Sequence, residues 1–253
     1  MTSGFKEKAI VVGQEKIASD VYSMWIQTDD IAKNSKAGQF VTVFSKDGSR
    51  LLPRPISICE IDGSKIRIVY RVVGKGTDEF STFESDEVID VQGPLGNGYP
   101  LFDKKAILLG GGVGIPPLLE LAKQLNCEKN IVLGYRDELF LNGEFAEYGK
   151  VTIATEDGSI GTKGNVLDAM KEHNITGDII YACGPKPMLR AIKEYAEANN
   201  IEAYISMEEK MACGVGACLG CVCKSIEIDD HSRVYNKRVC KEGPVFNSKE
   251  VEI

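Results

Sequence analysis

The sequence predicts a β plus α/β protein with an N-terminal antiparallel β-barrel, a parallel-sheet domain and a small cysteine-rich subdomain at the C-terminus. Short β-rich runs, separated by Gly, Asp, Ser and Pro at hairpin spacings, fill residues 1–102. β-rich and helical patterns then alternate over residues 103–210, which is typical of a parallel sheet with helices on both faces. Residues 211–253 hold five of the eight cysteines and are too few to fold well without a bound metal or a cross-link. We therefore predict three domains with these boundaries.

The predicted barrel is built from short strands and one helix. A short helix is expected at residues 77–82, within the sequence GTDEFSTF. The strands are expected at residues 9–12, 21–26, 39–44, 56–59, 66–73 and 88–91.

The predicted parallel sheet begins with a buried run at 106–109, followed by a glycine turn and a helix that Pro116 opens. Proline is favoured in the first turn of a helix, where its missing N–H has no partner to lose. Two further helices are expected at 166–172 and 186–198. The other strands are expected at 131–135, 151–154, 179–182 and 203–206.

Composition and charge exclude several classes of protein. The chain has 253 residues, 43% of them hydrophobic, so it has ample apolar surface to bury and is not intrinsically disordered. Its 30 Lys+Arg against 37 Asp+Glu give a net charge of −7, which argues against nucleic acid as the main partner. The start lacks an apolar core of signal-peptide length, and the most apolar stretch, 106–122, is broken by glycines and prolines. We expect a cytoplasmic protein without a membrane span.

The C-terminal cysteines have the spacing of a plant-type 2Fe-2S site. Cys213-x4-Cys218-x2-Cys221 is followed by the more distant Cys240. A tight loop can supply three thiolates to a compact cluster, and a distant strand can supply the fourth. The residues between the cysteines are mostly Gly and Ala, which let backbone N–H groups approach the sulfurs.

Zinc is the main alternative for these cysteines. Structural zinc usually takes two Cys-x2–4-Cys pairs, and here a single cysteine stands at the far end. A Rieske centre needs Cys-x-His elements, in which neither His173 nor His231 takes part. Cys223 complicates the choice of the fourth ligand, but it is too close to Cys221 for both to reach easily, and Cys240 closes the loop better.

A glycine-rich turn between a strand and a helix is the first candidate nucleotide site. Glycines at such a turn let the backbone approach a pyrophosphate, and the helix N-terminus supplies positive potential. The turn lacks the G-x-G-x-x-G fingerprint, because Ile115 stands at the last glycine position. A plain tight turn is the alternative. The candidate residues are Gly110, Gly111, Gly112, Val113 and Gly114.

A second candidate site lies in the predicted barrel. Arg54 could pair with a diphosphate, and the following strand could meet the polar edge of a planar ring. About twenty residues later, an aromatic residue, a cation and a Gly-rich turn precede the short helix. Each feature alone is weak, since a single Arg is more often a surface charge. The candidate residues are Arg54, Pro55, Ile56 and Ser57, then Val69, Tyr70 and Arg71, then Gly76 and Thr77.

The order of these motifs resembles the ferredoxin–NADP reductase superfamily. A barrel with Arg-Pro-x-Ser precedes Gly-Gly-Gly-x-Gly-x-Pro-Pro, and then Cys183-Gly184-Pro185-x-x-Met188. The tail sequence MACGVGAC, residues 211–218, narrows the resemblance to the electron transfer subunits of type B dihydroorotate dehydrogenase. It covers essentially the whole chain.

This resemblance implies FAD in the barrel, NAD(H) in the parallel-sheet domain and a 2Fe-2S cluster in the tail. It also implies an FMN-containing dihydroorotate dehydrogenase catalytic subunit as partner, with two copies of each subunit. Electrons would pass from that FMN through the cluster and FAD to NAD+, in de novo pyrimidine (UMP) biosynthesis. The alternative is an NAD(P)H-dependent flavin and iron–sulfur reductase that serves ferredoxin or another redox partner.

The resemblance also assigns roles to residues by matching motif. Arg54, Pro55, Ile56 and Ser57 would hold the flavin and its diphosphate. Val69, Tyr70 and Arg71 would line the FAD, and Gly76 and Thr77 would bind its phosphates. Gly110, Gly111, Gly112, Val113 and Gly114 would accept the nicotinamide nucleotide, and Cys213, Cys218, Cys221 and Cys240 would ligate the cluster. The long gap after Cys221 would place an extra hairpin at 229–236. No side chain is expected to be a general base, and the roles of Cys183 and Cys223 stay open.

Overall fold

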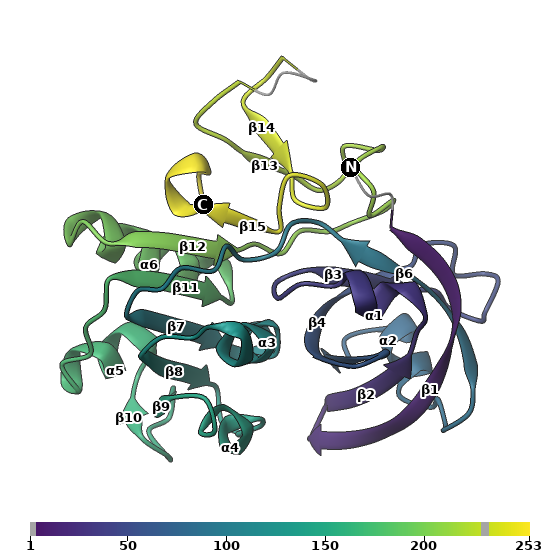
Figure 1. Cartoon of the computed structure of the whole chain (residues 1–253), viewed down its shortest axis with the longest axis horizontal. Coiled ribbons are helices and arrows are strands. Elements are labelled where there is room, and N and C mark those ends of the chain that lie inside the picture. Colours follow the sequence, from purple (N-terminus) through teal and green to yellow (C-terminus); the bar gives the residue numbers. More distant parts are fainter. Residues whose placement is uncertain (1–3, 229–232) are drawn as a thin grey trace.

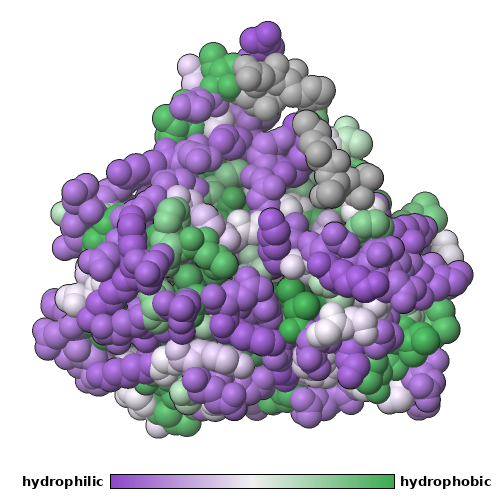
Figure 2. Space-filling view, viewed as in Figure 1, coloured by the Kyte–Doolittle hydropathy of each residue, from purple (hydrophilic) through white to green (hydrophobic). Residues whose placement is uncertain are grey.

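The computed structural model describes residues 4–228 and 233–253, which form a barrel, a larger sheet and a small C-terminal part (Figure 1). The barrel lies to the right of the sheet in this view, and the C-terminal hairpin lies above both. Hydrophilic residues cover most of the face seen in this view, and hydrophobic residues appear on it in scattered patches (Figure 2). No described helix is long and apolar enough to cross a membrane.

The barrel is closed, with the strand order β1-β2-β5-β4-β3-β6 and antiparallel pairing throughout. Every predicted strand is present, and alternate side chains such as Val11, Ile26 and Ile68 fill a continuous apolar interior. The elements are β1 (Phe5–Ala18), β2 (Val21–Gln27), α1 (Asp30–Asn34), β3 (Phe40–Val43), β4 (Arg54–Asp62), β5 (Lys65–Arg71), α2 (Lys75–Phe80) and β6 (Val88–Leu95).

The larger sheet has the order β10-β9-β8-β7-β11-β12-β15. The predicted parallel sheet is confirmed from β10 to β12, and antiparallel β15 extends it at one edge. Its strands are β7 (Ala106–Gly111), β8 (Lys129–Tyr135), β9 (Lys150–Thr155), β10 (Thr162–Lys163), β11 (Ile179–Cys183), β12 (Glu202–Ser206) and β15 (Val245–Asn247). Its helices are α3 (Pro117–Gln124), α4 (Asn142–Phe145), α5 (Val166–Glu172) and α6 (Lys186–Ala198), with a 3-10 turn at η1 (Gly112–Gly114).

Helices cover both faces of this sheet, as the alternation in β7 requires. Ile107 and Leu109 pack in one core with side chains of α5 and α6, whereas Leu108 packs in another core with α3 and α4. The side with α3 faces the barrel, where the buried Glu120 accepts a hydrogen bond of 2.8 Å from Ile61 N on β4. The two domains therefore meet along α3.

The C-terminal part contains β13 (Val222–Lys224), β14 (Asn236–Arg238) and the 3-10 turn η2 (Ser248–Glu250). β13 and β14 pair as a hairpin, and of the hairpin predicted at 229–236, residues 229–232 lie outside the described residues. β15, although within 211–253, pairs with β12 of the larger sheet. The three domain boundaries themselves stay a prediction.

Candidate functional site

A cavity of about 330 Å³ lies where the barrel meets the sheet. Seven of the nine residues that the sequence assigns to the flavin line it, from β4, β5 and α2. They are Pro55, Ile56, Ser57, Val69, Tyr70, Arg71 and Thr77. The phenol of Tyr70 is fixed in this wall, because it donates a 2.6 Å hydrogen bond to Gln14 Oε1. The structure therefore brings together residues that lie more than twenty positions apart in the sequence.

A second cavity, of about 520 Å³, opens at the carboxyl ends of β7, β8, β9 and β11. Ligands of open parallel sheets bind at this edge. Gly111, Gly112, Val113 and Gly114 line the cavity as predicted, but Gly110 does not, since its open side faces Ile115 and Leu118.

The two cavities share three residues, Arg71, Val113 and Glu208. Gly114 makes this junction possible, because a Cβ there would lie 2.5 Å from the backbone carbonyl of Cys183. The turn after β7 therefore packs directly against the turn after β11.

Arg71 supplies an unused donor at the junction. Its Nε is buried and has no hydrogen-bond partner among the described residues, although a carboxylate oxygen of Asp20 lies 3.4 Å away. A buried donor without a partner is costly, and a polar ligand atom would satisfy it. This donor and the shape of the cavity fit a flavin. Glu208 is the acidic residue that the two cavities share. Its side chain is exposed to solvent, but desolvation by the surrounding protein raises the pKa of its carboxyl.

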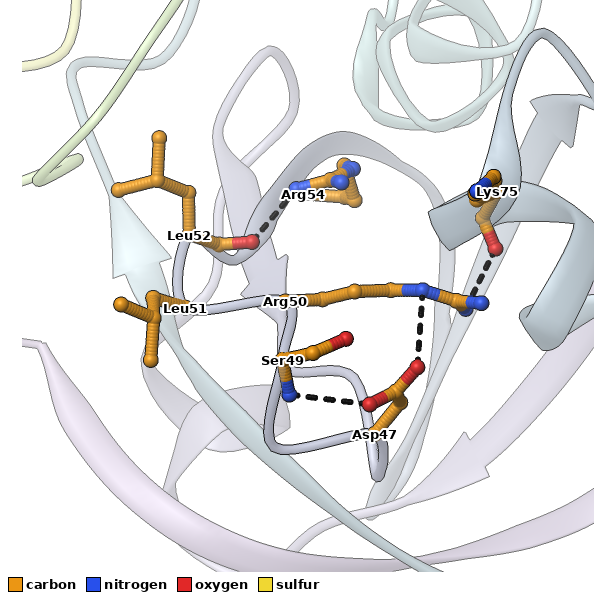
Figure 3. Close-up of a pocket in the computed structure, with 7 residues that line it drawn as sticks. All are labelled: Asp47, Ser49, Arg50, Leu51, Leu52, Arg54 and Lys75. Carbon is orange, nitrogen blue, oxygen red and sulfur yellow. Dashed lines mark hydrogen bonds and ion pairs between the residues drawn. The ribbon is translucent and has the colours of Figure 1, made fainter.

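Arg54 lines a third hollow instead, beside α2 (Figure 3). Its Nη1 donates to Leu52 O at 2.5 Å, and its guanidinium lies so close to α2 that a Cβ on Gly76 would be 2.6 Å from Nε. Only glycine permits this approach. The hydroxyl of Thr77 caps α2 by accepting from Val73 N at 3.0 Å, so it is committed to the backbone.

The four predicted cluster cysteines gather in one loop region, and each sulfur accepts a backbone N–H. The donor–sulfur distances are 3.3 Å for Ala217 N to Cys213, 3.4 Å for Gly220 N to Cys218, 3.4 Å for Cys240 N to Cys221 and 3.1 Å for Gly216 N to Cys240. Such donors stabilise the negative charge of thiolates and of a reduced cluster. The donor set therefore fits a 2Fe-2S cluster.

The sulfurs are arranged as two pairs. Cys213 contacts Cys218, and Cys221 contacts Cys240. A single zinc ion needs its ligands around one point, and within residues 4–228 and 233–253 no three His, Cys, Asp or Glu side chains converge on such a point. Two pairs of thiolates are compatible with a cluster of two irons.

The pKa values of these cysteines reflect the contacts within each pair. Burial raises the pKa of Cys213, but backbone N–H groups and the Cys218 side chain outweigh it and lower the pKa to about 7. A hydrogen bond from Cys240 is the main reason why the pKa of Cys221 falls to about 6, while that of Cys240 rises. Burial raises the pKa of Cys223 to about 11.

Cys183 lies at the end of β11 and is buried, and burial raises the pKa of its thiol. It lines neither cavity. Packing against the turn after β7 accounts for its position.

Sequence reasoning missed several residues that line the flavin cavity. Ser206 is the last residue of β12, and Met207, Glu208 and Glu209 follow it, so a strand end in a parallel sheet was the available signal. Met211 and Pro244 had no such signal, because only the fold brings them to the cavity. The remaining lining residues are Phe40, Val73 and Val113.

Comparison with known proteins connects these sites to a family. Residues 208–252 match the model of the iron-sulfur cluster binding domain of dihydroorotate dehydrogenase B. Two curated relatives, from Caldanaerobacter subterraneus and Fusobacterium nucleatum, are each 43% identical over 98% of this chain and 98% of their own. Both are named dihydroorotate dehydrogenase B (NAD(+)), electron transfer subunit.

Solved structures agree. The structure of an NADH-dependent reduced ferredoxin-NADP oxidoreductase is 30% identical, with a TM-score of 0.86 over 97% of this chain and 90% of that chain. The flavohem-like FAD/NAD binding domain of a Vibrio cholerae nitric oxide dioxygenase shares the fold, with a TM-score of 0.67 at 16% identity over 81% of this chain and 98% of that chain. By its sequence over nearly its full length, this chain belongs to the family of dihydroorotate dehydrogenase B (NAD(+)) electron transfer subunits.

Proposed function

We propose that this chain carries electrons from the FMN of a dihydroorotate dehydrogenase catalytic subunit, through a 2Fe-2S cluster and FAD, to NAD+ in de novo pyrimidine biosynthesis. One observation carries the proposal: the three candidate sites form a series. Met211 and Pro244, which flank the cluster cysteines in the sequence, line the flavin cavity. The flavin cavity in turn adjoins the sheet-edge cavity at Arg71, Val113 and Glu208.

The residues that would hold FAD follow from this series. Pro55, Ile56, Ser57, Val69 and Tyr70 would surround the flavin ring. Arg54 would meet the diphosphate beside Gly76, and Arg71 would donate from Nε, which has no hydrogen bond among the described residues, to a polar flavin atom. Thr77 would shape the cavity as the cap of α2.

The residues that would hold NAD lie at the sheet edge. Gly111, Gly112, Val113 and Gly114 would let the backbone approach the nucleotide. Gly110 would act beneath them by letting Ile115 pack close.

When bound, flavin exchanges a hydride with nicotinamide and single electrons with the cluster, so it links the two kinds of transfer. The protein sets positions and electrostatics. Cys221 and Cys240 would ligate the cluster from the interior, since both are buried, whereas Cys213 and Cys218 would hold its outer edge. No side chain of this chain needs to act as a general base.

The outer edge of the cluster loop is the proposed surface for the catalytic subunit. Cys218 is exposed, and apolar Val215 and Leu219 beside it are 44% and 45% exposed. A protein partner would cover these side chains and shorten the electron path.

The proposed oligomeric state is an assembly with two copies of each subunit. We also propose a cytoplasmic location, as expected from the sequence.

The test is reconstitution. The purified chain alone should oxidise NADH with an artificial acceptor but should not oxidise dihydroorotate. Adding an FMN-containing dihydroorotate dehydrogenase subunit should produce NAD-linked dihydroorotate oxidation, and the two chains should co-elute. Oxidation of dihydroorotate by this chain alone, or a mixture that stays separate and NAD-inactive, would contradict the proposal.

A second candidate is an NAD(P)H-dependent reductase for ferredoxin or another redox partner. The 30% identity to the ferredoxin-NADP oxidoreductase structure over 97% of this chain favours it as runner-up. In the same experiment, it predicts rapid NADH-dependent reduction of ferredoxin and no stable complex with the FMN subunit.

A further inference from the structure

Arg238 is a buried cation close in sequence to the cluster cysteines. It is the last residue of β14 in the C-terminal hairpin (Figure 1), two residues before Cys240, and its side chain is only 7% exposed. It is neither a predicted cluster ligand nor a lining residue of either nucleotide cavity. Burying a guanidinium is costly unless its donors find acceptors. The acceptors of Arg238 therefore indicate what this charge does in the protein.

The guanidinium of Arg238 binds two acceptors at once. Its Nε donates to Glu242 Oε2 at 3.0 Å and its Nη2 donates to Glu242 Oε1, so the two side chains form a bidentate ion pair. The remaining nitrogen, Nη1, donates to the backbone carbonyl of Gly216 at 3.0 Å, and this hydrogen bond is buried. Arg238 therefore fixes a peptide group of the cluster loop from a position outside that loop.

The carbonyl that Arg238 binds belongs to a peptide group that also contacts a cluster cysteine. The same peptide group carries the N–H of Ala217, which donates to Cys213 Sγ at 3.3 Å. In a trans peptide the C=O and the N–H point in opposite directions, so one end faces Arg238 and the other faces the sulfur. A cation at the carbonyl polarises the peptide and strengthens its N–H as a donor. Arg238 therefore acts on Cys213 through a single peptide group.

The preceding peptide group contacts the other pair of cysteines. The N–H of Gly216 donates to Cys240 Sγ at 3.1 Å, and Cys240 in turn contacts Cys221. Gly216 has a φ of +82°, which glycine adopts readily, so the chain turns here and the two successive N–H groups reach different sulfurs. Gly216 therefore lies between the two pairs of sulfurs, and Arg238 holds it at its carbonyl.

The other side of this ion pair is anchored to the barrel. The backbone carbonyl of Glu242 accepts a hydrogen bond of 2.8 Å from Asn97 Nδ2, in the segment after β6. The backbone carbonyl of Arg238 accepts from Lys241 N at 3.0 Å and from Glu242 N at 2.9 Å, which closes the turn that carries Cys240. The ion pair therefore connects the cluster loop to a turn that is fixed on the barrel.

We infer that Arg238, held by Glu242, is a positioning residue that raises the reduction potential of the 2Fe-2S cluster. It keeps two backbone N–H groups directed at Cys213 and Cys240, and such donors stabilise the additional negative charge of a reduced cluster. A higher potential makes the cluster a better acceptor for electrons from the catalytic subunit. This inference rests on the proposed cluster ligands and adds to them a residue that tunes the cluster.

The test measures the midpoint potential of the cluster in the full, flavin-loaded chain, by a redox titration that follows the reduced-state paramagnetic resonance signal. Arg238→Lys keeps the positive charge beside Glu242, but an ammonium cannot bind both carboxylate oxygens and Gly216 O in the geometry of the guanidinium. We expect it to lower the potential by about 59 mV, which is a tenfold change in a one-electron equilibrium. Hydrogen exchange should become faster at the amides of Gly216 and Ala217.

Two further variants accompany this one. Arg233→Lys is the matched control, because it makes the same substitution at an exposed position of the C-terminal part, and it should change neither the potential nor the exchange. In Glu242→Gln, Arg238 loses its charged partner but still reaches Gly216, so the potential should fall by a smaller amount. Thermal unfolding and flavin content check that all variants remain folded.

The outcomes separate this inference from the proposed cluster site. An unchanged potential in Arg238→Lys with full iron content overturns the inference, and so does an equal shift in Arg233→Lys. If Arg238→Lys loses iron but keeps its flavin, Glu242→Gln decides, since a lower potential supports the inference and an unchanged one overturns it. If Cys240→Ser keeps its full iron content, the proposed ligand set is wrong and the inference falls with it.

Discussion

Two regions of the molecule are stabilised by different kinds of interaction. One is the junction between the barrel and the larger sheet, and the other is the cluster loop. At the junction, Arg67 of β5 is buried, donates from Nε to Ser23 Oγ at 2.8 Å, and reaches Glu144 of α4 with both Nη atoms. Glu120 adds a buried bond to the barrel backbone. In the cluster loop, residues 214–220 are mostly small and exposed, and their N–H groups bond to cysteine sulfurs.

This difference distinguishes a region that the polypeptide stabilises by itself from a region that a cofactor must stabilise. The junction places opposite charges and apolar cores against each other, so it can form without any ligand. The loop buries little apolar surface, and its sulfurs would repel one another as thiolates without metal. We therefore expect loss of the cluster to disorder the loop while the two larger domains remain folded.

The largest effect of a substitution is expected at Cys240, the proposed fourth cluster ligand. Cys240→Ser should abolish the cluster, because Cys240 accepts from Gly216 N and contacts Cys221. Cys223→Ser is the matched control, since Cys223 is also a buried cysteine but lies outside the predicted ligand set. Iron and sulfide content and the reduced-state paramagnetic resonance signal are the measurements. Hydrogen exchange should rise in residues 212–222 only.

The opposite pattern would reject this ligand set. A full iron content in Cys240→Ser, with loss in Cys223→Ser, would make Cys223 the fourth ligand. Fast exchange spreading into β7 or β5 would show that the cluster also holds the junction together.

The next effect concerns the junction. Arg67→Met removes a buried cation from Glu144 and Glu60, and we expect the free energy of unfolding to fall by about 3 kcal/mol. Lys8→Met is the control, because Lys8 pairs with Asp90 on the exposed barrel surface and should cost less than about 0.5 kcal/mol. Chemical denaturation measures both. Iron content should be unchanged in Arg67→Met if the two regions are independent.

A smaller effect is expected in the flavin site, which lies between the two regions. Arg54→Ala should weaken FAD binding roughly tenfold to hundredfold, because a charge-assisted contact to phosphate contributes on the order of 1.5–3 kcal/mol. Fluorescence titration of FAD measures the dissociation constant. An unchanged constant would remove Arg54 from the flavin site.

The two regions also differ in how far the sequence predicts them. The predicted cluster ligands are close in the chain, so their spacing alone predicts Cys213, Cys218 and Cys221, and the structure places Cys240 beside Cys221. The nucleotide cavities are different, because Met211 and Pro244 reach the flavin cavity only through the fold. The motif assigns Gly110 to the nucleotide, which stays a prediction, and in the structure Gly110 packs against Ile115 and Leu118.

The fold itself was predicted well where elements are long. The longer strands and helices of the parallel sheet have clear apolar patterns, and their predicted ranges lie close to the observed ones. The two-residue strand β10 is too short to show such a pattern and was not predicted. The short helices α1 and α4 have too few residues to show a period, and β15 looks like part of the cysteine-rich tail because its pairing with β12 is long-range.

The smallest effect is expected from pH, at an exposed contact between the two domains. Glu138 of the loop after β8 accepts from Ser19 N at 2.6 Å and from the Ser19 hydroxyl, which lies in the turn between β1 and β2. These hydrogen bonds, the hydroxyl's first, lower the pKa of Glu138 below its ordinary value of 4.5. A carboxyl whose pKa is lowered in the folded state stabilises the fold at pH values above its ordinary pKa. This contribution disappears as the pH falls through the lowered pKa.

The wild type should therefore have a slightly higher Tm than Glu138→Gln at pH 7, and the difference should shrink below about pH 4.5. Asp157→Asn is the control, because Asp157 accepts hydrogen bonds from the nearby Ser159 N and Ser159 hydroxyl, and among the described residues none of its hydrogen bonds joins the two domains. Only Glu138→Gln should increase hydrogen exchange in the turn at Ser19, and a Tm difference that grows on acidification would contradict the assigned contact.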